Sequence, residues 1–289
     1  MDNSGRVTSH LSGILYRTTN LIESGIKVAF VFDGKPHPFK AATLQERAEV
    51  REKAQAAWDE AKAQGRDGFK YAQAASRLNQ EILADSMRLI TAMGLPTIQA
   101  PSEGEAQAAY MAARGDVYIV GSQDYDSLLF GAPLVVRNLA ITGKRKLPRK
   151  NVYVDVEPEV IALEDELARM GISRKQLVEI GIMCGTDYNP GLMRVGPKTA
   201  LKLIREHGDL ESVLESQKES IENFQEIREF FLHPDVTDDY AIKMSKPRID
   251  EIVSFLSGER DFSSERVEKT AQRLEEAFKV GQSTLDRWF

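Results

Sequence analysis

The sequence has little cysteine and no long apolar stretch. One cysteine, Cys184, among 289 residues excludes an internal disulfide and fits a reducing compartment. Apolar runs such as residues 28–32 fall far short of the ~20 residues needed to span a bilayer. Residues 1–7 are polar and lack the basic and apolar regions of a signal peptide. We therefore expect a protein of the cytoplasm.

An excess of positive charge is also lacking. The chain has 38 Lys and Arg against 44 Asp and Glu, a formal net charge of -6, which taken alone argues weakly against a nucleic-acid partner. Two basic clusters, at residues 143–150 and 194–205, are local exceptions. With 42% apolar residues, the chain is long enough for one large domain or two small ones.

Helical and strand patterns alternate over the first half of the chain. Amphipathic or helix-forming stretches predict helices at residues 9–24, 41–75, 79–93 and 102–114. Short β-rich runs predict strands at residues 27–32, 97–100, 116–120 and 133–138. This alternation favours an α/β fold with a mainly parallel sheet. After about residue 157 the strands are expected to end, and residues 158–280 read as helices.

Acidic residues follow three of the predicted strands. Ligands of parallel α/β sheets bind outside the carboxyl ends of the strands, so these side chains are expected to converge there. A further aspartate, at the end of a helix-like run, is expected to reach the same place. The carboxylates are Asp33, Glu103, Glu105, Asp124, Asp126 and Asp187.

Each acidic residue also has an ordinary structural explanation. Ser102 with Glu105 matches a helix capping box, residues 124–126 fit a solvated turn, and Asp33 fits a helix N-cap. The combination favours a metal site, because unneutralised carboxylates 4 Å apart repel by about 4 kcal/mol per pair at an effective dielectric of 20. All-oxygen ligation favours Mg²⁺ or Mn²⁺, and two such ions ~4 Å apart are the usual device for phosphodiester hydrolysis.

Basic side chains accompany the acidic ones. Lys40 and Arg47 are two helical turns apart and share a helix face, from which they would hold the scissile phosphate; a solvated basic face is the alternative. Further along, a turn at Gly196 opens a helix that bears Lys198 and Lys202. Such a turn can bind a DNA phosphate, and it also fits an ordinary helix start with proline at its first position.

The last residues form an aromatic pattern. Gln282, Leu285, Trp288 and Phe289 follow the spacing Q-x-x-h-x-x-a-a, and in one 3₁₀ turn the apolar members share a side. Terminal aromatics suggest a docking peptide, with packing onto the protein's own core as the alternative.

Together these motifs resemble the flap endonuclease family along essentially the whole chain. The segments that carry the resemblance, in order, are "VFDGKP", "APSEGEAQAA", "QDYDSLLFG", "GTDYNPG", "VGPKTALKLI" and "QSTLDRWF". The resemblance implies a PIN-like α/β nuclease that cleaves 5′ flaps at DNA junctions in replication and repair. It also implies a monomer in an archaeal cell, associated with the nucleoid.

The resemblance further implies a division of the chain and a role for each part. A nuclease region is expected at residues 1–157, with a helical arch at 41–80. A helical region is expected at 158–280, with a helix–two-turn–helix element at 187–206. Residues 281–289 would bind the sliding clamp PCNA. The carboxylates resemble the ligands of two Mg²⁺ ions, and Lys40 and Arg47 resemble the cations of the arch.

Two departures from the family pattern bear on function. First, the chain starts at the equivalent of the helix that follows the family's N-terminal strand, which bears a catalytic aspartate. A catalytically impaired DNA- and clamp-binding protein is therefore the alternative to a flap endonuclease. A metal phosphatase, a third possibility, would need neither the hairpin turn nor the tail. Second, Arg194 occupies the position of the first glycine of the family's Gly-h-Gly turn. If that position requires a positive φ, the turn is strained or reshaped.

Overall fold

The computed structural model describes residues 2–4, 6–63, 80–140, 143–146 and 153–285 and divides the chain into two compact units. Unit 1 comprises residues 1–30, 47–98 and 239–289, and unit 2 comprises residues 31–46 and 99–238. The two units are therefore interleaved in sequence. Within the described ranges, no helix has both the length and the apolar character that crossing a bilayer requires. The predicted linear domain boundaries remain predictions.

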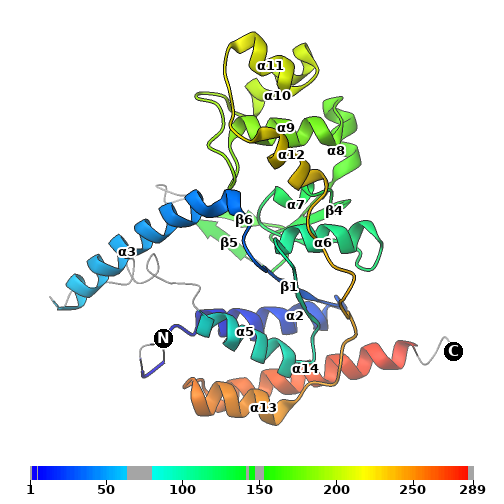
Figure 1. Cartoon of the computed structure of the whole chain (residues 1–289). Coiled ribbons are helices and arrows are strands. Elements are labelled where there is room, and N and C mark those ends of the chain that lie inside the picture. The colour runs from blue at the N-terminus through cyan, green and yellow to red at the C-terminus, as the bar shows by residue number, and fades with distance from the viewer. Residues whose placement is uncertain (1, 5, 64–79, 141–142, 147–152, 286–289) are drawn as a thin grey trace. The chain divides into compact units, whose positions relative to one another are not determined.

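Unit 1 is built from helices (Figure 1). The predicted helix at 9–24 is present as α1 (Ser9–Ser12), the π-helical turn η1 (Gly13–Arg17) and α2 (Thr18–Glu23). The predicted helix at 79–93 is α5 (Gln80–Ala92). The chain's last helices are α13 (Ile249–Val253), the π-helical turn η3 (Ser254–Glu259) and α14 (Ser264–Leu285). Helix α14 packs against α2 and α13, and α5 packs against α1 and α13. The side chains buried in this unit include Leu11, Leu15, Leu89, Ile90, Met93, Phe255 and Leu274.

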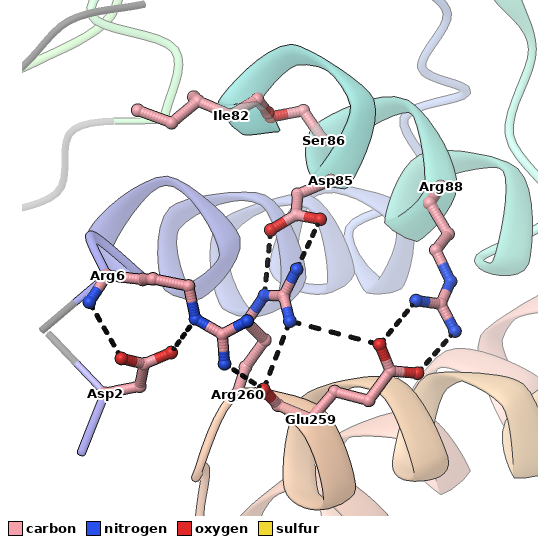
Figure 2. A network of polar contacts seen from close by, with 8 residues as sticks. All are labelled: Asp2, Arg6, Ile82, Asp85, Ser86, Arg88, Glu259 and Arg260. Carbon is pink, nitrogen blue, oxygen red and sulfur yellow. Dashed lines mark hydrogen bonds and ion pairs between the residues drawn. The ribbon is translucent and has the colours of Figure 1, made fainter. Parts of the chain in front are cut away.

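A polar network ties α5 of unit 1 to η3 and to the first residues of the chain (Figure 2). Arg260 donates from Nε and Nη2 to the two carboxylate oxygens of Asp85, each at 2.8 Å, and both side chains are nearly buried. Arg88 makes a second bidentate pair with Glu259. Arg6 donates to the backbone carbonyl of Glu259 at 2.7 Å. Because bidentate geometry satisfies both ions, the Asp85–Arg260 pair can hold its charges away from solvent, whereas Arg88 and Glu259 remain partly exposed.

The sheet of unit 2 confirms the α/β prediction and corrects its details. Strand β3 (Val120–Gly121) pairs in parallel with β4 (Leu134–Arg137), and β4 pairs antiparallel with β7 (Glu159–Ala162). The expectation that no strand follows about residue 157 is wrong, because β7 lies beyond that point. Four residues are too few for a clear period, and β7 is defined by its hydrogen bonds to β4. Strands β1 (Phe30–Phe32) and β2 (Thr97–Gln99) form a separate two-stranded sheet. The sequence boundaries between the two units fall after Phe30 and after Ile98.

The basic cluster at residues 143–150 is described only in part. Its first half forms β5 (Gly143–Lys146), which pairs antiparallel with β6 (Tyr153–Val156). Residues 147–150 lie outside the described residues.

The helices of unit 2 place the acidic loops and the hairpin turn. Two lie in the α/β part, α6 (Gly104–Ala113) and α7 (Asp126–Leu129). The others are α8 (Leu163–Met170), α9 (Arg174–Cys184), α10 (Pro197–His207), α11 (Leu210–Gln217) and α12 (Phe224–Leu232). Ser173 and Gln176 form a capping box that starts α9. The buried carboxylate of Glu179 on α9 accepts from Arg228 on α12 at 2.8 Å and from the backbone N–H of Leu210 at 3.3 Å, which ties three helices together.

Helix α3 (Ala41–Ala63) accounts for the first part of the predicted helix at 41–75 and of the arch at 41–80. Its first residues belong to unit 2 and the remainder to unit 1. Residues 64–79 lie outside the described part of the chain.

Candidate active site

Lys40 lies between two of the predicted carboxylates. It ends the 3₁₀ turn η2 (Pro38–Lys40), which His37 caps by accepting from the backbone N–H of Phe39 at 3.4 Å. The Lys40 Nζ donates to Glu103 Oε2 at 2.7 Å and lies 3.5 Å from Asp187 Oδ2. All three residues belong to unit 2. Lys40, which was predicted to lie near the acidic residues, thus contacts two of them directly.

The charge of Lys40 is set by burial and by its neighbours, which act in opposite directions. Burial alone would lower the pKa of Lys40, but the hydrogen bond that it donates to Glu103 and the charges of Glu103, Asp187 and Asp33 raise it above its usual value. The side chain is therefore a permanent cation at neutral pH.

Asp33 supplies a hydrogen-bond acceptor to the N-terminus of helix α6, although it lies far away in the sequence. It follows β1, and its Oδ1 accepts from the backbone N–H of Gly104 at 2.7 Å. A Cβ at Gly104 would lie 3.0 Å from that oxygen, so the absence of a side chain allows the close approach. The predicted alternative, a capping box of Ser102 and Glu105, is wrong, because the N-cap residue is Glu103 and no side chain of its own segment caps the helix.

Glu105 points instead into a buried polar setting. Its Oε1 accepts from the hydroxyl of Ser122, and its Oε2 is buried with no hydrogen-bond partner in the described residues. Burial, with the charges of Asp126 and Asp124, raises the pKa of Glu105, although the hydroxyls of Ser122 and Ser127 oppose the shift. A buried carboxylate oxygen without a donor is a position where a cation would be stabilised.

The loop after β3 carries the next pair of carboxylates. Asp124 is exposed, as a solvated turn requires, and its backbone N–H donates to Ser122 Oγ at 3.1 Å. Asp126 begins α7 and is half-buried. Burial, followed by the charges of Asp187 and Asp124, raises the pKa of Asp126, while Lys40 opposes the shift. The electrostatic coupling shows that these side chains share one neighbourhood.

Asp187 reaches that neighbourhood from the turn after α9. Thr186 and Asn189 close the turn through a backbone bridge and a side-chain hydrogen bond of 2.8 Å. The hydroxyl of Thr43, at the start of α3, donates to the backbone carbonyl of Asp187 at 2.7 Å. Contacts over a long sequence separation therefore hold Asp187 in place.

The donor set suits a hard divalent cation in its chemistry, although the side chains do not yet surround one. Among the residues that the structure describes, no three acidic, histidine or cysteine side chains converge closely enough to hold an ion as they stand. Glu103 and Asp187 are bridged by Lys40 instead. Burial and neighbouring acidic charges raise the pKa values of Glu105 and Asp126, so a cation bound beside them would be stabilised. Oxygen donors in this setting fit Mg²⁺ or Mn²⁺.

An aromatic cluster supports Lys40, and the sequence analysis did not predict it. The Lys40 Nζ lies 5.8 Å from the ring centroid of the buried Tyr188. Tyr188 meets Phe230 and Phe231 edge-on, with ring centroids 5.0 and 5.4 Å apart. The His37 ring lies tilted against Phe230, with the centroids 4.3 Å apart. Burial and the neighbouring carboxylates strongly raise the pKa of Tyr188. Tyr188 lies in the segment "GTDYNPG", of which only the neighbouring Asp187 was predicted to belong to the site.

Arg47 is exposed on α3 and belongs to unit 1, whereas Lys40 belongs to unit 2. Its proposed contact with the scissile phosphate stays a prediction.

The predicted DNA-binding turn has the expected local structure. Gly196 is the N-cap of α10, Pro197 is at its first position, and Lys198 and Lys202 are exposed. Arg205, on the same helix, donates from Nε to the backbone carbonyl of Met170 at 3.0 Å.

The predicted tail is described only in part. The backbone at Gln282 and Leu285 continues helix α14, which ends at Leu285. Trp288 and Phe289 lie outside the described residues. Clamp binding by these residues therefore stays a prediction.

Comparison with known proteins defines the class first. Residues 1–54 match the XPG N-terminal domain and residues 94–187 match the XPG I-region, so the chain is a nuclease of the XPG class. It is 68% identical over 288 residues to Flap endonuclease 1 of Methanothrix thermoacetophila and 55% identical over 289 residues to that of Archaeoglobus fulgidus. Each comparison covers 100% of this chain and 86% of the relative. The solved structure of flap endonuclease-1 from Methanococcus jannaschii is 38% identical, with a TM-score of 0.74, and the match covers 96% of this chain and 84% of that one. The chain belongs to the flap endonuclease 1 family.

Proposed function

We propose that this chain is a metal-dependent, structure-specific endonuclease that cleaves 5′ single-stranded flaps at DNA junctions during replication and repair. The observation that carries the proposal is the position of Lys40, a permanent cation held between Glu103 and Asp187 beside further carboxylates that form no ion pair with the residues that the structure describes. Family membership supplies the reaction class. Nothing in the comparisons supports the alternative of a DNA- and clamp-binding protein without catalysis.

The metal would be held by the carboxylates of unit 2. These residues are Asp33, Glu103, Glu105, Asp124, Asp126 and Asp187, and two Mg²⁺ ions, or Mn²⁺ ions, are the group proposed for them. When bound, such ions polarise the phosphodiester and lower the pKa of an attacking water.

Lys40 would bind the scissile phosphate. An ammonium group has three N–H donors, and contacts to Glu103 and Asp187 leave at least one for a phosphate oxygen. A fixed cation beside the reacting group offsets the negative charge that develops in the transition state. The Tyr188 ring limits where the ammonium can move. Arg47 would contact the same phosphate from α3.

Two further surfaces would bind the partners. Gly196, Lys198 and Lys202 would hold the phosphate backbone of the duplex beside the flap, because phosphate contacts position a protein on DNA without reading its sequence. Residues 281–289 would bind PCNA. We further propose that the protein acts as a monomer in the cytoplasm, at the nucleoid.

The test removes one carboxylate without changing its shape. Asp126→Asn is expected to reduce Mg²⁺-dependent flap cleavage at least 100-fold, with flap-DNA binding in EDTA retained, because the phosphate contacts lie mostly elsewhere. The control is Asp165→Asn, an exposed carboxylate in the first turn of α8. It should leave cleavage unchanged. Wild-type cleavage by Asp126→Asn would exclude Asp126 from the site.

A further inference from the structure

Arg194 has a backbone conformation that disfavours its own side chain. Its φ is 62°, in the left-handed region that glycine adopts without cost. The carbonyl of Leu192 accepts from the backbone N–H of Val195 at 3.2 Å, which makes Met193 and Arg194 the two central residues of a turn. Only the second of them has a positive φ, the pattern of a type II turn, whose third residue is usually glycine. The strain expected from the family's Gly-h-Gly pattern is therefore present.

No contact within the described protein accounts for this arginine. The side chain is exposed, and it makes no hydrogen bond or ion pair with any residue that the structure describes. The preceding residue, Met193, is also exposed, at 86%. A glycine would satisfy the same turn without strain, so the arginine side chain does not stabilise this turn through its backbone conformation.

Arg194 heads a row of unpaired cations. Lys198 and Lys202 follow at intervals of four residues, both exposed and both without an ion pair in the described ranges. The contrast is Arg205, whose guanidinium is held by the carbonyl of Met170. Three cations beside one turn, none neutralised by the described protein, form a surface that attracts an anion.

We propose that Arg194 is a phosphate-binding residue that adds a contact to the duplex backbone beyond those of Lys198 and Lys202. A guanidinium presents a rigid fork of donors that matches the oxygens of a phosphate. Backbone strain that no internal contact explains is characteristic of functional positions. This inference rests on the proposed DNA-binding function of the hairpin and extends it by one residue.

The first experiment measures stability and DNA binding in the same variant. For Arg194→Gly, the unfolding midpoint should rise by about 2 °C, because the left-handed strain is removed. Affinity for a flap-bearing duplex in EDTA should fall about five- to tenfold at 100 mM salt. The slope of log K against log salt should become less steep by about 0.9, the value for one lost phosphate contact. Arg194→Asn, which tolerates the same φ without the charge, should show the same loss of slope.

The matched control is Lys218→Gly. Lys218 is also an exposed cation of unit 2 with a positive φ, 54°, at the end of α11. Its replacement should raise the unfolding midpoint similarly and leave the salt slope unchanged. A slope that is unchanged in Arg194→Gly, or lowered equally in Lys218→Gly, would overturn the proposal for Arg194.

A third variant separates this inference from the function on which it rests. Lys202→Gln should lower the salt slope by the same amount if the hairpin binds the duplex. A loss of slope in Lys202→Gln without one in Arg194→Gly would refute only the role of Arg194. An unchanged slope in both would refute DNA binding by the hairpin as well. Arg194→Lys, which keeps the charge, should retain the wild-type slope.

Discussion

Glu105→Gln is expected to stabilise the metal-free protein while it abolishes cleavage. In the wild type, Oε2 of Glu105 is buried and has no donor at full hydrogen-bond geometry among the described residues, although the unpaired hydroxyl of Ser127 is near enough to act on the carboxylate. The charges of Asp126 and Asp124 act on the same carboxylate. An unsatisfied buried polar group costs about 1–3 kcal/mol, and more when charged. The amide retains the shape without the charge, so we expect a gain of about 1–2 kcal/mol at neutral pH. For a protein of this size, that corresponds to a rise of several degrees in the unfolding midpoint.

The gain in stability of Glu105→Gln should be larger at neutral pH than at acidic pH. Burial and neighbouring acids raise the pKa of Glu105 above its value in the unfolded chain, so the folded state holds the proton to a higher pH. The wild type therefore loses stability as pH rises from the unfolded-state pKa, about 4.5, through the higher folded-state pKa. The advantage of Glu105→Gln should be complete at neutral pH and should disappear as pH falls towards about 4.5.

The assay is thermal unfolding in EDTA at several pH values, repeated with added Mg²⁺. Mg²⁺ should stabilise the wild type more than Glu105→Gln, because a ligand stabilises the state that binds it. Glu164→Gln, an exposed acid on α8, serves as the control and should change neither measurement. A Glu105→Gln protein that is less stable than the wild type at neutral pH, or a difference that does not vary with pH, would refute the reasoning.

Three further predictions concern the cation pair, the tail and the network of unit 1. Lys40→Ala and Arg47→Ala should each slow the single-turnover cleavage rate more than they weaken flap binding; a loss of affinity alone would make them ordinary backbone contacts. Replacing Trp288 and Phe289 together with alanine should remove clamp binding in calorimetry, because buried aromatics dominate small interfaces, and should leave clamp-independent cleavage unchanged. Asp85→Ala should lower the free energy of unfolding by about 3 kcal/mol in urea titration, because a buried guanidinium loses its bidentate partner; a change below about 1 kcal/mol would contradict this.

The positions of the acidic residues could be predicted because they follow strands. Asp33 and Asp124 come after short β-rich runs, as predicted, although the strands β1 and β3 that precede them belong to separate sheets. The hydrogen-bond partners of the individual carboxylates could not be predicted. Asp33 caps a helix that begins 71 residues later, and Lys40 pairs with a glutamate 63 residues away. Neither contact produces a periodic pattern in the sequence.

The capping box shows how a local signal can fail. The spacing of Ser102 and Glu105 matches the motif, yet Glu105 turns to the hydroxyl of Ser122, and Asp33 supplies an N-terminal acceptor instead. The aromatic support of Lys40 was missed for a related reason. Tyr188, Phe230 and His37 come from three separate segments, and none of them has a pattern of its own.

The sequence by itself indicated the helices at residues 9–24, 79–93 and 102–114, most strands, the acidic residues proposed as metal ligands and the unusual residue Arg194 in a turn. Apolar spacing, turn residues and a missing glycine act within a few residues, so they can be read without a fold. Tertiary structure alone decided that β7 joins the sheet, that Lys40 lies between Glu103 and Asp187, and that Glu105 has an unsatisfied oxygen. These features depend on burial and on pairing between distant segments, and both arise only when the chain has folded.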